Sequence, residues 1–194
     1  MTDTLKYSLG VLGCIILLFL YNQNSQKSNI AIGEAIFPGQ RENVSRIVIS
    51  EDDKLIELIR SDTTWIISQA DSLLIKENQI DKVFDRLLLV EQEMLITSKE
   101  EKWEKFGVDD SLGRHLRIFD ENDKELIHFV FGNSGQDYQH NYIREHKSSD
   151  VYRTNDNVYF LLNSNVTYWG KKPPKPEPEE KKEENSDCIR LLPS

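Results

Sequence analysis

The sequence predicts an α+β fold, in which antiparallel β-hairpins and a meander carry helices packed on one face, preceded by one N-terminal transmembrane helix. Three observations support this class. Short apolar runs flank acidic turns, as in IVISEDDKLIELI. Within these runs the side chains alternate with the two-residue period of β-strands, which is typical of β-hairpins. The segment KENQIDKVFDRLLLVEQEM repeats its apolar residues with the period of a helix. The segment VLGCIILLFLY is continuously apolar, as a membrane span requires.

The run from Leu5 to Tyr21 is predicted to be an uncleaved membrane anchor. It has about 17 residues, close to the lower limit of roughly 17 to 25 for a span, and Lys6 is its single charge. Tyr7 and Tyr21 bracket it as interfacial aromatic residues do. Lipid attachment at Cys14 fits less well, because the apolar residues follow this cysteine instead of preceding it. A cleaved secretory signal fits poorly, because no small-x-small pair follows the run. A buried soluble helix also fits poorly, because the run has no amphipathic stripe.

Composition divides the chain into four parts. We expect an anchor at residues 1–21, a polar stalk at 22–43, an α+β domain at 44–170 and a tail at 171–194. The tail contains KKPPKPEPEEKKEEN, whose prolines and charges cannot build a core, so it is expected to be disordered. Its apolar end, CIRLLPS, is either a short docking peptide or a frayed end.

Charge and cysteine content limit the function further. The net charge of −9 disfavours nucleic acid and anionic headgroups as partners. The two cysteines lie in the anchor and in the tail, so no disulfide framework is expected to hold the domain together.

The domain is expected to begin with a three-stranded meander over VSRIVISEDDKLIELIRSDTTWIIS, with Trp65 anchoring the last strand in the core. A helix follows, and its buried stripe is Ile80, Val83, Phe84, Leu87 and Leu88. LITS predicts a short strand, and KEEKWEKFG a short helix that ends at Gly107.

Two more hairpins are predicted in HLRIFDENDKELIHFVFGN and NYIREHKSSDVYRT, with a closing helix in NDNVYFLLNSNV. The first of these hairpins echoes IVISEDDKLIELI, either through an internal duplication or because hairpins with acidic turns look alike.

A series of short motifs also occurs in a distinctive order: TTWIIS, the helix around residues 81–88, KFGVDD, FVFGN, NYIRE and DVYRT. This order resembles the family known as domain of unknown function 4340. The matching positions are Trp65, Phe106, Gly107, Val108, Asp109, Phe131, Gly132, Tyr142, Ile143, Arg144, Val151 and Tyr152. The resemblance covers about residues 44–169. The sequence departs from the family pattern in two ways. The proline that usually follows the turn at KFGVDD is missing, and Ser111 and Leu112 occupy that region. The chain also holds one copy of the domain, whereas many relatives are longer.

The resemblance implies an envelope domain anchored by one helix in the bacterial inner membrane, often alongside ABC-transporter components related to gliding motility. A short N-terminus ahead of one span predicts that the N-terminus is inside and the domain is extracytoplasmic. The predicted function is therefore that of a non-enzymatic accessory protein that binds an envelope protein, with a transporter as one partner class. The alternative is a binding module for a small ligand or a cell-wall glycan, which needs a concave aromatic pocket.

No catalytic or cofactor-binding residue is predicted, and the family offers none. The acids lie on a short helix and a turn, no serine has a nucleophile-elbow context, and FGNSG lacks the lysine and spacing of a phosphate loop. Tyr142, Arg144 and Tyr152 are the predicted interaction surface, because interfaces favour tyrosine and arginine. The alternative is a tyrosine packed on the sheet with an arginine on its rim. Gly107 and Gly132 are expected to adopt positive φ where a helix and a strand end.

The four histidines are the only candidates for metal chemistry. If residues 115–120 pair with 125–130, His115 and His128 lie diagonally on one sheet face, within side-chain reach. A third ligand would have to come from His140, His146 or an acid. Half-exposed histidines on a polar face are the ordinary explanation, so no metal site is predicted.

Overall fold

The computed structural model describes residues 12–15, 33–134 and 137–174. Its strands are β1 (Arg46–Glu51), β2 (Lys54–Ser61), β3 (Thr64–Ile67), β4 (Leu74–Ile75), β5 (Gln92–Thr97), β6 (Arg114–Phe119), β7 (Glu125–Ser134), β8 (Asn141–Glu145), β9 (Val151–Thr154) and β10 (Gly170–Lys171). Its helical segments are η1 (Arg41–Asn43), α2 (Gln79–Lys82), η2 (Val83–Leu87), η3 (Glu100–Lys102), α3 (Trp103–Phe106), η4 (Tyr159–Leu161) and α4 (Val166–Trp169).

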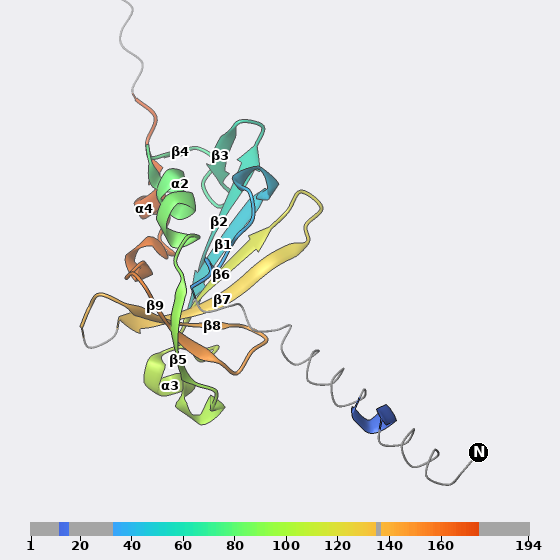
Figure 1. Cartoon of the computed structure of the whole chain (residues 1–194). Coiled ribbons are helices and arrows are strands. Elements are labelled where there is room, and N and C mark those ends of the chain that lie inside the picture. The colour runs from blue at the N-terminus through green and yellow to red at the C-terminus, as the bar shows by residue number, and fades with distance from the viewer. Residues whose placement is uncertain (1–11, 16–32, 135–136, 175–194) are drawn as a thin grey trace, which may run out of the picture.

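An antiparallel sheet of eight strands forms the body of the domain (Figure 1). The strand order is β3-β2-β1-β6-β7-β8-β9-β5, and β10 pairs with β4 in a separate small sheet. The meander β1-β2-β3 and the hairpins β6-β7 and β8-β9 confirm the sequence predictions. The fold is thus mostly antiparallel sheet with a few short helices, as an α+β class requires.

One face of the sheet packs against most of the helical segments. The predicted stripe from Ile80 to Leu88 is buried in the main core together with Ile47 and Ile49 of β1. Only residues 79–82 are α-helical, because the chain continues as a π-helical turn in η2. Trp169 of α4 is also in this core, which places α4 on the same side.

The opposite face is covered by α3, which corrects the expectation that all helices lie on one face. The Phe106 ring lies 4.7 Å from the Tyr142 ring, and Trp103 lies against Arg144. Tyr142 and Arg144 alternate with Ile143, which is in the main core. Because neighbouring residues of a strand point to opposite faces, α3 and the main core lie on different sides.

The folded part of the chain begins earlier than residue 44. Ile36 and Phe37, assigned to the stalk by their sequence, are buried in the core. The backbone around them bonds to the segment before β5, through Ile36 N–H to Val90 O at 2.9 Å and Phe37 N–H to Leu88 O at 3.2 Å. This part of the expected stalk therefore belongs to the domain.

Two further elements differ in detail from the expectation. Trp65 is only partly buried, 6.0 Å from the Phe84 ring, and Ile67 is the fully buried residue of β3. The expected closing helix is a single 3-10 turn, η4, with the separate short helix α4 after it. Asn157 and Asn163, with polar side chains that bond the nearby backbone, flank these short turns.

The glycine predictions had mixed outcomes. Gly107 ends α3 with φ of 63°, as expected for a helix terminus. Gly132 does not adopt positive φ within β7. A Cβ at this position would lie 1.9 Å from the Phe106 carbonyl oxygen, so glycine is needed for close approach of α3 to the sheet.

Most of the predicted anchor and tail lie outside the described residues. Residues 12–15 are helical, with Cys14 exposed. Within the described ranges, no helix has both the length and the apolar character to cross a bilayer.

Candidate functional site

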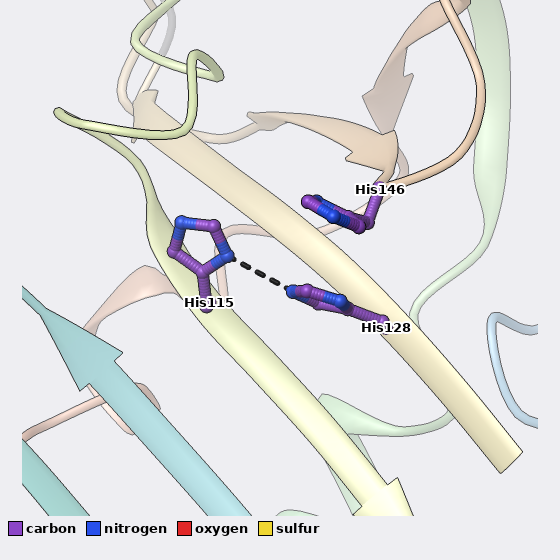
Figure 2. Close-up of side chains that lie close together, drawn as sticks. All are labelled: His115, His128 and His146. Atoms are coloured by element: carbon purple, nitrogen blue, oxygen red, sulfur yellow. Dashed lines mark hydrogen bonds between the residues drawn. The ribbon is translucent and has the colours of Figure 1, made fainter. Parts of the chain in front are cut away.

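Three histidines meet on the face of the sheet that α3 covers. His115 lies on β6, His128 on β7, and His146 directly follows β8. The register pairs Arg117 with His128, which puts His115 diagonally across from His128 as predicted. The His146 N–H donates to the His128 carbonyl at 2.9 Å, so three adjacent strands present these rings together (Figure 2). We call His115, His128 and His146 the histidine cluster.

The rings of the histidine cluster are in close contact. His115 Nδ1 and His128 Nε2 are 2.9 Å apart, which is a hydrogen-bond distance. The His128 and His146 rings are stacked, with centroids 4.0 Å apart and planes 18° apart. One ring nitrogen from each residue lies within 4.8 Å of the other two.

Hydrogen bonds indicate which ring nitrogens carry protons. His115 Nε2 lies 3.1 Å from the Asp110 carbonyl oxygen, which can only accept, so Nε2 is the protonated nitrogen. In the neutral ring, His115 Nδ1 is then an acceptor for the N–H of His128 Nε2. The buried Nδ1 of His146 has no hydrogen-bond partner among the described residues, although an Asp110 carboxylate oxygen lies 3.5 Å away.

The surroundings favour neutral imidazoles in this cluster. Burial, followed by the charges of His146, His115 and Arg117, lowers the pKa of His128 to about 3. Burial also lowers the pKa of His115, and the hydrogen bond to the Asp110 carbonyl opposes this shift only in part. At neutral pH both rings are therefore neutral.

The low pKa of His128 predicts a loss of stability in acid. In the unfolded chain this histidine titrates near 6.5, so between about 6.5 and about 3 the unfolded state binds a proton that the folded state does not bind. The free energy of unfolding should therefore be largest above pH 6.5 and fall as the pH is lowered through this window. Urea unfolding at several pH values, with a chelator present, measures the dependence.

A matched pair of variants isolates the His128 contribution. The free energy of unfolding of His128→Gln should depend less steeply on pH than that of the unchanged protein, because the variant lacks the imidazole whose pKa is lowered by folding. His140→Gln is the control, because His140 is similarly shielded, with 19% of its side chain exposed against 14% for His128. Equal slopes for the His128→Gln variant and the unchanged protein would contradict the prediction.

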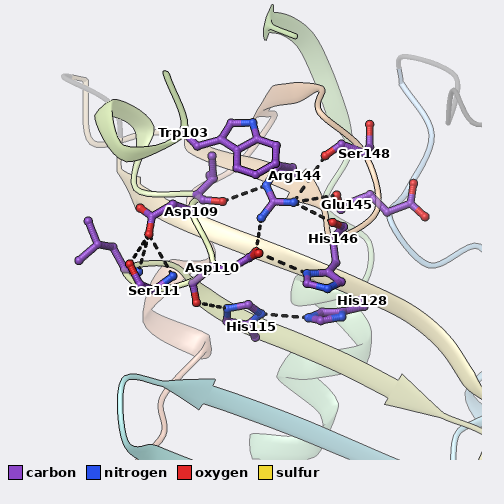
Figure 3. A network of polar contacts seen from close by, with 12 residues as sticks. Trp103, Asp109, Asp110, Ser111, His115, His128, Arg144, Glu145, His146 and Ser148 are labelled. Atoms are coloured by element: carbon purple, nitrogen blue, oxygen red, sulfur yellow. Dashed lines mark hydrogen bonds and ion pairs between the residues drawn. The ribbon is translucent and has the colours of Figure 1, made fainter. Parts of the chain in front are cut away.

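A buried arginine lies beside the histidine cluster (Figure 3). The Arg144 side chain is 0% exposed, and its guanidinium lies 3.8 Å from the Trp103 ring centroid. Its Nε–H donates to Val108 O at 2.9 Å, one Nη donates to His146 O at 2.8 Å, and the other Nη pairs with the Asp110 carboxylate. Arg144 thus connects the loop after α3 to the end of β8, which carries His146.

The loop after α3 has its own polar support. The Asp109 carboxylate accepts from Ser111 N–H at 3.0 Å, the Ser111 hydroxyl at 2.6 Å and Leu112 N–H at 3.0 Å. Burial raises the Asp109 pKa, but these hydrogen bonds outweigh it and leave the pKa below its ordinary value. The turn holds the neighbouring Asp110 close to both Arg144 and His146.

The predicted interaction surface is not one surface in the structure. In the β8-β9 hairpin, Ile143 pairs with Tyr152 and Arg144 pairs with Val151. Directly paired residues share a face, so Tyr152 lies on the side of Ile143, opposite to Tyr142 and Arg144. Arg144 is fully buried, Tyr152 is 9% exposed, and Tyr142 packs on Phe106. Their observed contacts are with the protein interior.

Two hollows adjoin the described site residues. One, of about 450 Å³, is bordered by His115, His128 and Asp110 and by the acidic turn at residues 51–53. The other, of about 300 Å³, is bordered by three aromatic rings: Phe106, Tyr142 and Tyr159. The first reaches the histidine cluster, and the second lies beside α3.

Sequence reasoning found the His115–His128 pair but not the complete site. The pair follows from hairpin register, whereas His146 joins it through the pairing of β7 with β8. It also missed the burial of Arg144, whose partners Val108 and Asp110 lie 36 and 34 residues earlier in the chain. Alternation within NYIRE indicates only that Arg144 points away from the sheet face that carries Ile143 and the main core.

Comparison with known proteins gives one match. Residues 65–181 match the sequence profile of the family described as "Domain of unknown function (DUF4340)". The match covers more than half of the chain and begins at the third strand of the meander. No curated protein and no solved structure matches the chain.

Proposed function

The chain belongs to the DUF4340 family, and we propose that it is a non-enzymatic, membrane-anchored accessory protein that binds another protein of a bacterial cell envelope. In this proposal, residues 5–21 are the anchor in the inner membrane, the N-terminus is inside and the domain is extracytoplasmic. An ABC-transporter component is the first partner class to test.

The observation that carries the binding proposal is the edge of the large sheet at β5. This strand is terminal in the strand order, with β9 as its single strand neighbour among the described residues. The segment at residues 33–37 bonds to the chain before β5 and to Gln92. Beyond Gln92, no described backbone group bonds to the outer side of β5.

Two neighbouring side chains of this edge strand are apolar and accessible. Met94 is 45% exposed and Leu95 is 44% exposed, and Leu89 nearby is exposed as well. An unpaired edge offers a row of backbone N–H and C=O groups to a strand from another chain. The partner segment we propose is an extended stretch of an envelope protein with apolar side chains facing Met94 and Leu95.

Leu95→Lys should reduce binding of such a partner by roughly fivefold or more, because a charge on an edge strand opposes strand addition. The measurement is cross-linking in intact cells, purification of the full chain in mild detergent, and quantitative mass spectrometry. Leu55→Lys is the matched control, since Leu55 is 45% exposed on β2 and lies far from β5 in the strand order.

Two results would overturn the proposed edge. The first is equal recovery of the partner with Leu95→Lys and with the unchanged protein. The second is strong protection from hydrogen exchange, in the isolated chain, of those amides of residues 93–97 that do not donate to β9, because the outer edge would then be paired already.

The aromatic hollow favours the second candidate, a binding module for a small ligand or a cell-wall glycan. Phe106, Tyr142 and Tyr159 border it, and the Arg114 guanidinium covers Tyr159 at 4.1 Å from the ring centroid. Thermal unfolding of the full chain with glycan fragments separates the two functions. A ligand of this hollow raises the melting temperature by mass action, whereas an absent protein partner leaves it unchanged.

A further inference from the structure

We propose that His115, His128 and His146 bind one late first-row transition-metal ion, with Zn²⁺ as the first candidate. This site is independent of the proposed partner surface, because β5 and the histidine strands are separate parts of the sheet. Imidazole nitrogen is a preferred ligand of Zn²⁺, Cu²⁺ and Ni²⁺, and three protein ligands with an open fourth position are a common arrangement for zinc.

The geometry is close to that of a bound site. Nitrogens that bind one tetrahedral zinc at about 2.05 Å lie about 3.3 Å from one another. Here one pair is 2.9 Å apart, and all three nitrogens lie within 4.8 Å. Metal binding would require side-chain rotations, because the stacked His128 and His146 rings must turn their nitrogens toward a common point. The rings are held on three hydrogen-bonded strands, so the backbone needs no rearrangement.

The surrounding groups indicate which ring nitrogens of His115 and His128 would bind a metal. His115 would bind through Nδ1, because its Nε2–H is held by the Asp110 carbonyl at 3.1 Å. His128 would bind through Nε2, which without a metal donates its proton to His115 Nδ1, so binding requires this proton to leave Nε2. The Glu125 carboxylate lies 3.9 Å from His128 Nδ1 and is the nearby acceptor for a proton on that nitrogen. Metal-binding histidines usually donate their other ring N–H to an oxygen of this kind.

Two observations favour a cation at the histidine cluster. The Nδ1 of His146 is buried without a hydrogen-bond partner within the described part of the chain, at a cost that a nearby cation or an altered tautomer would remove. One ring nitrogen from each of the three residues lies within 4.8 Å of the other two, so three possible ligand atoms are close together. The histidine cluster is thus a preformed ligand set.

Access and charge are suited to a cation. The hollow of about 450 Å³ opens onto His115 and His128 and is bordered by the acidic turn at residues 51–53. Asp110 is the nearest carboxylate to His146, at 3.5 Å. Arg117 and Arg144 oppose a cation, but Arg144 is already paired with Asp110 and with backbone carbonyls.

The test is metal binding by the full chain, purified without a polyhistidine tag and treated with a chelator. Isothermal titration with Zn²⁺ should give one ion per chain, with a Kd below about 10 µM. Co²⁺ should bind at the same site and give visible absorption typical of a four-coordinate ion with nitrogen ligands. Mg²⁺ and Ca²⁺, which prefer oxygen ligands, should not bind there.

Variants distinguish the cluster from adventitious binding. His115→Gln, His128→Gln and His146→Gln should each weaken Zn²⁺ binding at least roughly tenfold. His140→Gln should leave it unchanged, because His140 pairs with Asp137 outside the cluster. If His128→Gln fails to fold, His146→Gln tests whether the cluster binds Zn²⁺. The His146 side chain is 38% exposed, so its replacement should disturb the fold less.

The proposal is overturned if Zn²⁺, Cu²⁺ and Ni²⁺ all bind with a Kd above about 10 µM. It is also overturned if folded His146→Gln binds Zn²⁺ as tightly as the unchanged protein, or if His140→Gln weakens binding as much as the cluster variants. None of these outcomes bears on the β5 edge.

Discussion

Replacing Arg144 with alanine is expected to lower the free energy of unfolding by about 3–5 kcal/mol. The guanidinium is fully buried, and its removal leaves the carbonyl oxygens of Val108 and His146 without their donor. It also leaves a void against Trp103, and the Asp110 carboxylate loses its charge partner. Arg144→Met should cost less than Arg144→Ala, because it keeps the contact with Trp103.

Arg153→Ala is the matched control on the neighbouring strand. Arg153 pairs with Glu93 at 2.7 Å, but 31% of its side chain is exposed, so its loss should cost less than about 1 kcal/mol. Urea unfolding of the full chain in mild detergent, followed by tryptophan fluorescence, measures both changes. Equal small losses for Arg144→Ala and Arg153→Ala would show that the buried network contributes little to stability.

Gly132→Ala should have the next largest effect, a loss of about 3 kcal/mol. The added Cβ would lie 1.9 Å from the Phe106 carbonyl oxygen and 3.0 Å from Val108 Cγ1. The nearest atom belongs to the backbone, so the end of α3 must move away from β7. The same movement would disturb the loop that brings Asp110 to Arg144.

Two other glycines test this explanation. Gly107→Ala should cost about 1–2 kcal/mol, because φ at this position is 63° and a left-handed conformation is strained for alanine. Gly13→Ala should change the domain's stability by less than about 0.5 kcal/mol, since no heavy atom of the described residues outside the local helix lies within 4 Å of the added Cβ. The same unfolding measurement applies. A loss at Gly132 no greater than that at Gly13 would exclude close approach as the reason for glycine.

The buried arginine and the histidine cluster share one structural support. Arg144 donates to the carbonyl of His146 and pairs with Asp110, which in turn contacts His115 through its carbonyl. Loss of Arg144 should therefore make the position of His146 less fixed and also lower the free energy of unfolding of the domain. A folded Arg144→Met variant offers a way to separate these two effects in the metal titration.

The hairpins, the meander and the helical stripe could be predicted because they depend on neighbours in the sequence. Alternation in IVIS and the acidic turn EDDK are sufficient to indicate β1 and β2. The stripe from Ile80 to Leu88 has the period of a helix. The continuation into the π-turn η2 was not predicted, because a local change in hydrogen bonding leaves the apolar period almost unchanged.

The candidate site was predictable only in part for a related reason. The sequence indicated that His115 and His128 share a face, since one hairpin sets their register. Choosing His146 over His140 as the third residue required the position of β8 beside β7. The bulge between Phe131 and Ser134 interrupts that pairing, so counting residues from the turn does not recover it.

By itself, the sequence determined the antiparallel hairpins, the helix around Ile80 to Leu88, the glycine that ends α3 and the family, because each depends on local periodicity, turn chemistry or motif order. Only the tertiary structure decided the strand order, the placement of α3, the burial of Arg144 and the meeting of three histidines. These features depend on backbone pairing and close approach between segments tens of residues apart. Side-chain alternation shows which way a residue points, but only the packed chain shows what covers it.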